Sequence, residues 1–434
     1  MSEDQFTLRT MRILFTTEYY PPFAPGGSPW SIRHLAEALA RRGHDVTVVT
    51  PNYGALAEET VGGVRVRRFP FWRRLPAGPS LARPRDLVSP RFHWRLFRAV
   101  RAVGREVGAE VFHAQEKHAL VGTYFAARAL RRPVFLTLRE VGLICPIATC
   151  LLSHEFVPAD CSILKLEREC AGFFLEHYHR GEGRLRRARI RLNLLLLYLD
   201  AWAKGFVIKR LDGLVSVSVG LLEIHLRAGR GLGHRSHVVY TPLPAEPPPD
   251  PAAIAAFRAR HGLEGKRAVL YVGKPSLGKG WLVFVDAAEQ VAREHPDVVF
   301  VGAGPDSPDR VPMGAALRWL GRLPHDAMPV LYGAADVVVL PAVGPEALSR
   351  VPLEAALAGR PTIGTRVGGI PEEIVDGQTG HLVPPGDAKA LAVVLDGLLR
   401  DDTLRIAMGE NARRFVAERF APDAVVRSLL DVWQ

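Results

Sequence analysis

Two glutamates have the side-chain type and the position to take part in chemistry. Glu346 and Glu354 follow an apolar run that ends at Leu340, and Pro352 between them is a natural first residue of a helix. A carboxylate just beyond a strand can accept hydrogen bonds from ligand hydroxyls and can stabilise positive charge at a reacting carbon. Glu354, in the first helical turn, could instead complement the helix dipole. Glu346, in the loop, has no such structural role.

The start of this helix is itself a candidate binding element. No Ser, Thr, Asp or Asn directly precedes Pro352, so we expect its first N–H groups to lack a side-chain cap. A bound phosphate would satisfy those groups.

Two lysines form a second candidate group. Lys274 and Lys279 lie in the segment Gly273-Lys274-Pro275-Ser276-Leu277-Gly278-Lys279-Gly280, directly after an apolar run. The segment nearly matches a nucleoside-triphosphatase loop, but Gly280 stands where a Ser or Thr would hold magnesium. We therefore interpret the lysines as a clamp on a diphosphate, with a basic turn as the alternative.

A glycine pair near the N-terminus could bring backbone close to the same ligand. Gly26 and Gly27 end a proline-containing loop that precedes a helix expected over Ser28–Arg42. Paired glycines allow close approach, and the helix start offers free N–H groups to a phosphate. A plain turn is the alternative interpretation.

The elements that must position these residues alternate between strands and helices. Strands are expected at Met11–Thr16, His44–Val49, Val111–His113, Val134–Leu138, Gly213–Ser218, Ala268–Val272, Val298–Val301, Val337–Leu340 and Pro361–Thr365. Such alternation predicts parallel sheets covered by helices, with ligands at the carboxyl ends of the strands. A proline-rich stretch, Thr241–Pro251, divides the chain into halves at 1–242 and 243–434, with an insertion at about 145–210. The last helix could pack back on the first half.

Length and charge narrow the class of protein. The chain has 434 residues, 48% of them hydrophobic and 23% charged, as expected for a folded two-domain protein. The net charge of +11 favours phosphate-bearing partners such as nucleotides or anionic lipid surfaces, with a solvated face as the alternative. Arginines are dense between residues 65 and 105 and between 180 and 191. No nucleic-acid-binding motif accompanies them, so nucleic acid is not an expected partner.

The sequence predicts a cytoplasmic protein. The first ten residues contain acids, lack an apolar run and look like a disordered lead rather than a secretory signal. The apolar stretch Leu192–Leu211 is interrupted by charges, so we do not expect it to cross a membrane. Preceded by arginines, it could lie on the inner membrane surface, or it could be a buried helix of the first half.

Cys145, Cys150, Cys161 and Cys170 lie in one region that also contains histidines. A metal site or a disulfide is conceivable, but the spacing lacks a CxxC pair and a cytosolic setting disfavours disulfides. We interpret them as ordinary thiols in a folded insertion.

An ordered set of motifs resembles glycosyltransferase family 4, the retaining enzymes with the GT-B fold. Glu346 and Glu354 match its E-x7-E element. The other matches are Gly26-Gly27, Gly43-His44-Asp45-Val46, Lys279-Gly280, Gly302-Ala303-Gly304-Pro305, Leu353-Glu354-Ala355, Gly359-Arg360-Pro361 and Gly368-Gly369-Ile370-Pro371-Glu372. They cover nearly the whole chain except about 150–191. The resemblance implies two Rossmann-like domains facing each other across a cleft.

The resemblance also implies roles for residues. Glu346 would contact the sugar of a nucleotide-sugar donor and Glu354 its ribose. The diphosphate would lie against the side chains of Lys274 and Lys279. It would also contact the backbone of Gly26, Gly27, Gly302, Ser349, Arg350 and Val351. The sugar would pass with retention to a glycan or lipid-linked acceptor. No essential metal and no further cofactor are expected, and the sequence has no Asp-x-Asp motif.

Two positions depart from the family pattern. Lys274 stands where arginine is usual and lacks its bidentate fork. Arg139, in Leu136-Thr137-Leu138-Arg139-Glu140, occupies the place of a histidine near the reacting sugar and cannot act as a base. His113 matches another family histidine, either catalytic or structural. A catalytically inactive sugar-nucleotide-binding protein and a GT-B-like sugar-nucleotide epimerase therefore remain as alternatives to the transferase.

Overall fold

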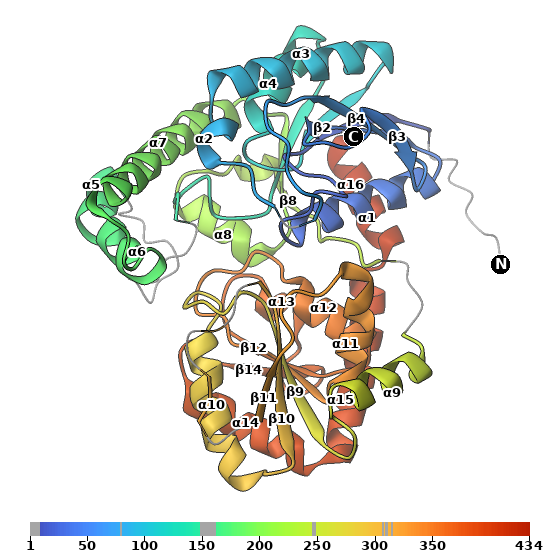
Figure 1. The fold of residues 1–434 in the computed structure, drawn as a ribbon. Helices are drawn as coiled ribbons and strands as arrows, with labels where there is room; N and C mark the ends of the chain where they lie inside the picture. The colour runs from blue at the N-terminus through green and yellow to red at the C-terminus, as the bar shows by residue number, and fades with distance from the viewer. Residues whose placement is uncertain are drawn as a thin grey trace, which may run out of the picture.

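A computed structural model describes residues 9–78, 80–147, 162–244, 249–305, 308, 311–313 and 316–434. Within these residues the chain forms two lobes, each built on a mainly parallel sheet, as Figure 1 shows. The predicted α/β class with two parallel-sheet domains is confirmed. Most of the expected N-terminal lead, part of the predicted linker, and both Cys150 and Cys161 lie outside the described residues.

The first lobe contains a sheet with the strand order β3-β4-β2-β1-β5-β6-β7-β8. Its pairs are parallel except for the antiparallel pair β3–β4. The strands are β1 Arg12–Thr16, β2 Asp45–Asn52, β3 Glu58–Val61, β4 Val64–Pro70, β5 Val111–Ala114, β6 Val134–Leu138, β7 Gly213–Ser216 and β8 Ser236–Val238. The helices are α1 Ser28–Arg41, α2 Pro84–Leu87, α3 Pro90–Glu106, α4 Leu120–Ala129, α5 Ile163–Lys165, α6 Ala171–Tyr178, α7 Arg184–Ile208 and α8 Val219–Arg227, with a π-helical turn at Leu166–Cys170 and a 3-10 turn at Gly233–Arg235.

Both faces of this sheet are buried, which explains its continuous apolar strands. Because side chains alternate along a strand, Leu14 packs in one core cluster while Ile13 and Phe15 pack in the cluster on the other face. The second cluster includes Leu430 and Trp433 from the last helix of the chain, α16 (Pro422–Trp433). Figure 1 shows this C-terminal helix in the first lobe, so the chain returns across the lobe boundary.

The second lobe contains a parallel sheet with the order β11-β10-β9-β12-β13-β14. Its strands are β9 Arg267–Val272, β10 Val298–Ala303, β11 Ala316–Trp319, β12 Val337–Leu340, β13 Thr362–Thr365 and β14 Gly380–Val383. Its helices are α9 Pro251–Arg260, α10 Trp281–Glu294, α11 Met328–Ala334, α12 Arg350–Leu357, α13 Ile370–Glu373, α14 Ala388–Arg400 and α15 Asp402–Arg419, with a 3-10 turn at His325–Ala327.

The strand order of the second lobe explains where its functional loops meet. β9 pairs with β10 on one side and β12 on the other, so the order reverses between β9 and β12. Loops that leave the carboxyl ends at such a point diverge and open a crevice for ligands. The loop with Lys274 and Lys279 follows β9, and the loop with Glu346 follows β12.

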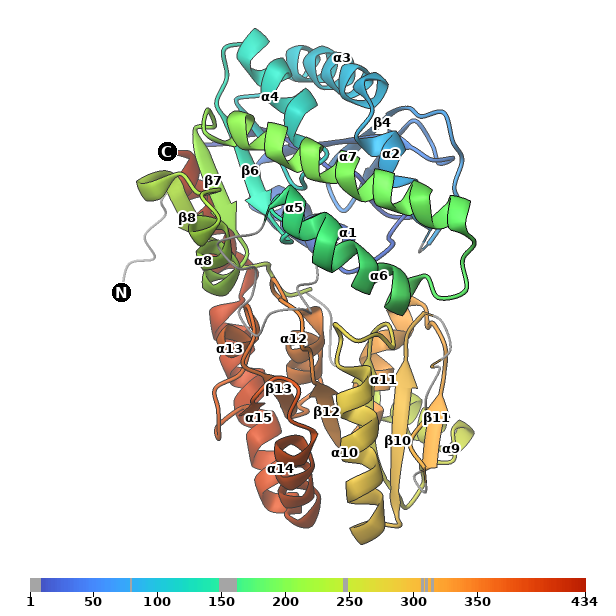
Figure 2. The ribbon, with the colours of Figure 1, turned by 90° about the vertical axis from the view of Figure 1, so that its left-hand side faces the viewer.

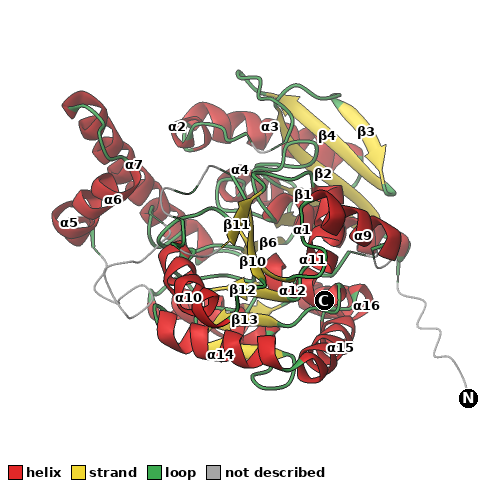
Figure 3. Cartoon of the chain, turned by 60° about the horizontal axis from the view of Figure 1, so that its bottom comes forward, coloured by secondary structure: helices red, strands yellow, loops and turns green. Residues whose placement is uncertain are grey.

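Helices α5, α6 and α7 form an insertion on one side of the first lobe (Figures 2 and 3). The apolar stretch in α7 is neither a fully buried helix nor a fully exposed one. Leu194, Ala201 and Ile208 are buried, whereas its outer residues Leu192, Leu196, Leu199, Trp202 and Phe206 are 44–54% exposed. In the described part of the chain, no helix is both long and apolar enough to cross a membrane.

Candidate functional site

The lysines and Glu346 line one cavity of about 440 Å³ between the lobes. Lys274, Lys279 and Glu346 belong to its second-lobe wall, and Arg139 belongs to its first-lobe wall. The structure therefore brings together side chains from separate parts of the sequence-predicted site. Three cations and two carboxylates, those of Glu346 and Glu140, line a space large enough for a charged, hydroxyl-rich ligand.

Glycine geometry fixes the lysine loop against the glutamate loop. Gly280 has a φ of +70°, and a Cβ there would lie 1.7 Å from the Pro341 carbonyl oxygen. The carbonyl of Gly278 accepts hydrogen bonds from the N–H groups of Val343 and Gly344, each at 3.0 Å. The Ser or Thr of a triphosphatase loop would not fit at position 280, which supports the diphosphate-clamp interpretation over that alternative.

Lys279 and Glu346 form an ion pair within this cavity. The Glu346 side chain is 13% exposed and that of Lys279 is 40% exposed, so the carboxylate is the more enclosed partner. A ligand that binds Lys279 through a phosphate would compete with this pair.

A second, buried carboxyl group lies behind the site and was not predicted. Glu373 is 3% exposed, and its burial raises its pKa well above the usual value, with the charges of Glu346 and Glu372 acting in the same direction. Burial thus favours the neutral carboxyl form of Glu373. Glu372 and Glu373 are adjacent in the sequence, and nothing there indicates that Glu373 is the buried one.

The helix after Glu346 begins earlier than predicted. α12 starts at Arg350 rather than Pro352, and Ser349 is its N-cap, with its hydroxyl accepting a hydrogen bond from the Val351 N–H at 3.3 Å. The expectation of a helix start without a side-chain cap was therefore wrong. The first turn offers fewer free N–H groups to a phosphate than the sequence indicated.

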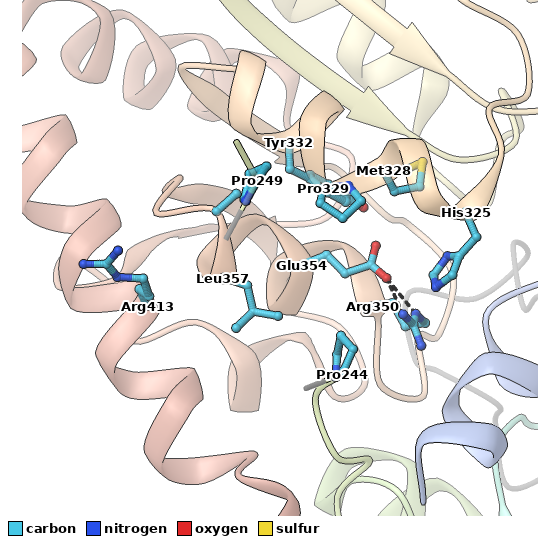
Figure 4. Close-up of a pocket in the computed structure, with 11 residues that line it drawn as sticks. Pro244, Pro249, His325, Met328, Pro329, Tyr332, Arg350, Glu354, Leu357 and Arg413 are labelled. Atoms are coloured by element: carbon cyan, nitrogen blue, oxygen red, sulfur yellow. Dashed lines mark hydrogen bonds and ion pairs between the residues drawn. The ribbon is translucent and has the colours of Figure 1, made fainter. Parts of the chain in front are cut away.

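Glu354 lies beside a second cavity, of about 210 Å³, rather than the one lined by Glu346. Figure 4 shows its carboxylate directed toward Arg350, and their ion pair has N–O distances of 2.6 and 2.8 Å. His325 and Tyr332 line the same pocket. Glu346 and Glu354 thus line separate cavities.

The glycines predicted to contact the donor differ in their surroundings. A Cβ at Gly27 would lie 2.8 Å from Cδ of Arg350, so Gly27 brings the first lobe against the start of α12. Gly26 has no atom within 4 Å of such a Cβ. A Cβ at Gly302 would lie 2.3 Å from the ring of Trp319, so packing between strands explains this glycine.

Arg139 extends from the end of β6 into the boundary between the lobes. Its guanidinium donates to the Gln115 side-chain oxygen at 2.8 Å and to the Thr241 hydroxyl at 3.4 Å. Burial lowers its pKa to about 10, opposed by the nearby carboxylate of Glu116. Arg139 is therefore a cation at physiological pH, suited to binding an anion or a hydroxyl group.

His113 lies in the core and not in either cavity. It is fully buried, with its ring among Phe15, Phe135 and Trp433, and its Nε2 lies 2.8 Å from the Thr137 hydroxyl. Burial lowers its pKa to about 3. Of the two roles left open for His113, the geometry supports the structural one, and we remove it from the catalytic set.

The insertion supplies an aromatic wall that sequence reasoning missed. Phe174 and Tyr178 of α6 line the 440 Å³ cavity opposite the lysine loop. Tyr178 forms a hydrogen bond with the backbone of Gly278, although burial raises its pKa overall. Figure 2 shows α6 at the edge of the first lobe that faces α10. Phe174 and Tyr178 are four residues apart, so the sequence could have placed both rings on one face of a helix. Nothing in the sequence indicated that this face lies toward the second lobe.

Within the described ranges, no group of three or more His, Cys, Asp or Glu side chains is placed to hold a metal ion. Cys145 is buried and Cys170 is half-buried. Lys274, Lys279 and Arg139 are the cationic side chains that line the larger cavity.

Comparison with known proteins agrees with this architecture. A family model described as "Glycosyl transferase 4-like domain" matches residues 26–231, and one described as "Glycosyl transferases group 1" matches residues 266–401. The two matches follow the two lobes. The chain is a glycosyltransferase with the GT-B fold.

Similar proteins include enzymes with different substrates. The chain is 32% identical to alpha-D-kanosaminyltransferase of Streptomyces kanamyceticus over 42% of this chain and 48% of that protein. It thus spans about half of that relative. It is 26% identical to glycogen synthase of Mycobacterium tuberculosis over 98% of this chain and 94% of that enzyme.

Solved structures share the whole fold. The Anabaena protein HepE, in complex with UDP and glucose, has a TM-score of 0.67 at 18% identity and covers 97% of this chain and 98% of its own. Sucrose-phosphate synthase from Thermosynechococcus elongatus has a TM-score of 0.67 at 21% identity, with 98% of both chains covered.

Proposed function

We propose that the chain is a retaining family 4 glycosyltransferase that moves a sugar from a nucleoside-diphosphate sugar to a glycan or lipid-linked acceptor. The observation that carries the proposal is the cavity in which Lys274, Lys279 and Glu346 meet Arg139 of the opposite lobe. Such an arrangement suits a ligand with a diphosphate at one end and hydroxyl groups at the other. A place in polysaccharide or glycoconjugate synthesis follows from this reaction.

The proposed chemistry assigns each charge a role. Lys274 and Lys279 neutralise the diphosphate as it leaves the anomeric carbon, and Glu346 accepts hydrogen bonds from the transferred sugar. Its negative charge also stabilises the oxocarbenium character of that carbon. The departing phosphate oxygen takes the proton of the acceptor hydroxyl, which attacks from the same face, so the anomeric configuration is kept. Lysine charges serve where a metal would otherwise be needed.

Glu354 is proposed to bind the ribose of the donor. Its carboxylate already lies at a cavity, held by Arg350. The ribose hydroxyls would replace part of this ion pair, while the backbone of Ser349 to Val351 and of Gly27 approaches the diphosphate.

A lipid-linked acceptor and a peripheral position on the inner membrane face are supported by the insertion. The exposed side of α7 carries leucines and aromatic rings, and its N-terminal part carries Arg184, Arg186 and Arg187. Apolar side chains with neighbouring arginines suit an anionic bilayer surface. Phe174 and Tyr178 of the same insertion line the cavity that also contains Glu346.

A thermal-shift screen tests the donor site. The purified protein is mixed with UDP, GDP, ADP and dTDP and with their common sugar conjugates, with and without EDTA. We expect one nucleotide series to raise the melting temperature selectively, and EDTA to leave the shift unchanged. Loss of the shift in Lys279→Ala would link it to the cavity. A folded protein that responds to none of the nucleotides contradicts the proposed donor site.

A further inference from the structure

Helix α8 of the first lobe begins directly against the second lobe. Its first two N–H groups, those of Val219 and Gly220, donate to the two carboxylate oxygens of Glu372, each at 2.9 Å. Glu372 belongs to α13 of the other lobe and also accepts the hydroxyl of Tyr240 at 3.1 Å. N–H groups at a helix start have no partner within the helix, and their partial positive charge favours a carboxylate. The Glu372 side chain of the second lobe thus accepts hydrogen bonds from the first lobe and from the segment between the lobes.

The backbones around this contact are too close for any side chain. A Cβ at Gly220 would lie 2.2 Å from the carbonyl oxygen of Gly368, and one at Gly369 would lie 2.1 Å from that of Ala347. Three segments from different parts of the sequence are therefore stacked backbone against backbone. The start of α8 thus packs directly on two segments of the second lobe, so a change in how the lobes meet alters this contact.

The third of these segments carries Glu346. The Gly369 N–H donates to the Glu346 carbonyl at 2.9 Å, and the Ser218 hydroxyl donates to the Ala347 carbonyl. Ser218 is also the N-cap of α8. The carbonyl groups of Glu346 and of the next residue are thus held by the start of α13 from their own lobe and by the start of α8 from the opposite lobe.

We propose that Glu372 is a positioning residue that couples the meeting of the lobes to the placement of Glu346. With the lobes together, its carboxylate fixes the start of α8, and Ser218 at that start fixes the Ala347 carbonyl. With the lobes apart, Val219 and Gly220 lose their acceptor and the glutamate loop loses one of its two supports. The proposal depends on the proposed function, because it takes Glu346 as the carboxylate that faces the donor sugar.

Glu372→Gln tests the coupling with a matched control. The amide keeps the shape but presents an NH2 group to one of the two N–H donors. Glu223→Gln makes the same change on α8, where Glu223 pairs only with Arg227 at 3.3 Å among the described contacts and is exposed. With the nucleotide sugar selected in the screen, we expect kcat of Glu372→Gln to fall by roughly 10-fold or more while KM for the donor changes less than about 3-fold. Glu223→Gln should match the wild type.

Ser218→Ala gives a second variant with no change of charge, and its kcat should fall in the same direction. A solution-scattering measurement without substrate supplies a second readout. The wild type should have a radius of gyration near the roughly 22 Å of a compact chain of this length, and Glu372→Gln a larger one. Unchanged kcat in both variants, or an unchanged radius in Glu372→Gln, overturns the proposal. If the wild type turns over no nucleotide sugar, the proposed function fails, while the scattering result still decides whether Glu372 holds the lobes together.

Discussion

Lys279 and Glu346 form an ion pair that joins the loops after two neighbouring strands, β9 and β12. Each is thus the other's counter-ion when no ligand is bound. A diphosphate brings charge that Lys279 can bind in place of the carboxylate, and Glu346 then becomes available to the sugar hydroxyls. In the proposed reaction, donor binding and release of the Glu346 carboxylate are coupled through this pair.

Lys279→Ala is expected to weaken nucleotide binding. A charge-assisted hydrogen bond contributes about 1.5–3 kcal/mol, so Kd for the preferred nucleoside diphosphate should rise roughly 10- to 150-fold. Titration calorimetry measures the change. Lys389→Ala, an exposed lysine of α14, is the matched control and should bind as the wild type does. Equal nucleotide affinity in the Lys279→Ala and Lys389→Ala variants would contradict the proposed role of Lys279 in binding the diphosphate.

Arg139→His is expected to make activity depend on pH where the wild type does not. Burial lowers the pKa of Arg139 to about 10, so the cation is present below that pH and is lost only above it. A histidine cation is lost at about pH 6.5 or below in a buried setting. Turnover of the variant should therefore fall between about pH 5.5 and 7.5. A pH–kcat profile like that of the wild type would show that the charge at this position has no part in the reaction.

His113→Gln is expected to change stability rather than catalysis. The pKa of His113 is about 3 in the folded protein because of burial, below its value of about 6.5 in an unfolded chain. The unfolded state then binds more protons between these values, so wild-type stability falls as the pH falls from 6.5 toward 3. Urea unfolding at pH 7 and pH 5 should show a smaller loss in the variant. A kcat at pH 7 reduced as strongly as by a substitution of Glu346 would restore His113 to the catalytic set.

Neutralising Arg184, Arg186 and Arg187 together is expected to weaken binding to anionic vesicles. Each basic side chain near such a surface contributes about 1 kcal/mol, so the three should weaken partitioning by roughly 100-fold. Flotation with phosphatidylglycerol and with phosphatidylcholine vesicles measures the effect. Replacement of the exposed α3 residues Arg98, Arg101 and Arg105 is the control. Equal losses in the two triple variants would assign the effect to net charge instead of α7.

The central strands and their functional loops could be predicted from the sequence because both depend on local pattern. β9 and β12 are continuous apolar runs, and the loops that follow them carry lysines and a glutamate next to glycine or proline. Strands at or next to the sheet edges were missed. β4 and β11, in which exposed or half-buried arginines interrupt the apolar residues, lack that pattern, and their pairing depends on neighbours distant in the sequence.

Contacts between the lobes could not be predicted because no local signal encodes them. Gly27 lies against Arg350, and Ser218 donates to the Ala347 carbonyl, yet each pair is far apart in the sequence. The burial of His113 under α16 and the aromatic wall of α6 likewise arise from packing between distant segments. Such features require the assembled fold.

The most direct test of the proposed reaction follows nucleotide-sugar turnover by proton NMR in the presence of EDTA. The wild type should cleave one donor, to an acceptor or to water, with the anomeric configuration retained in the first product. Glu346→Ala should lower kcat by roughly 100- to 1000-fold while its circular dichroism stays unchanged. Unchanged turnover in Glu346→Ala, an inverted product, or no turnover by a folded wild type would contradict the proposed mechanism.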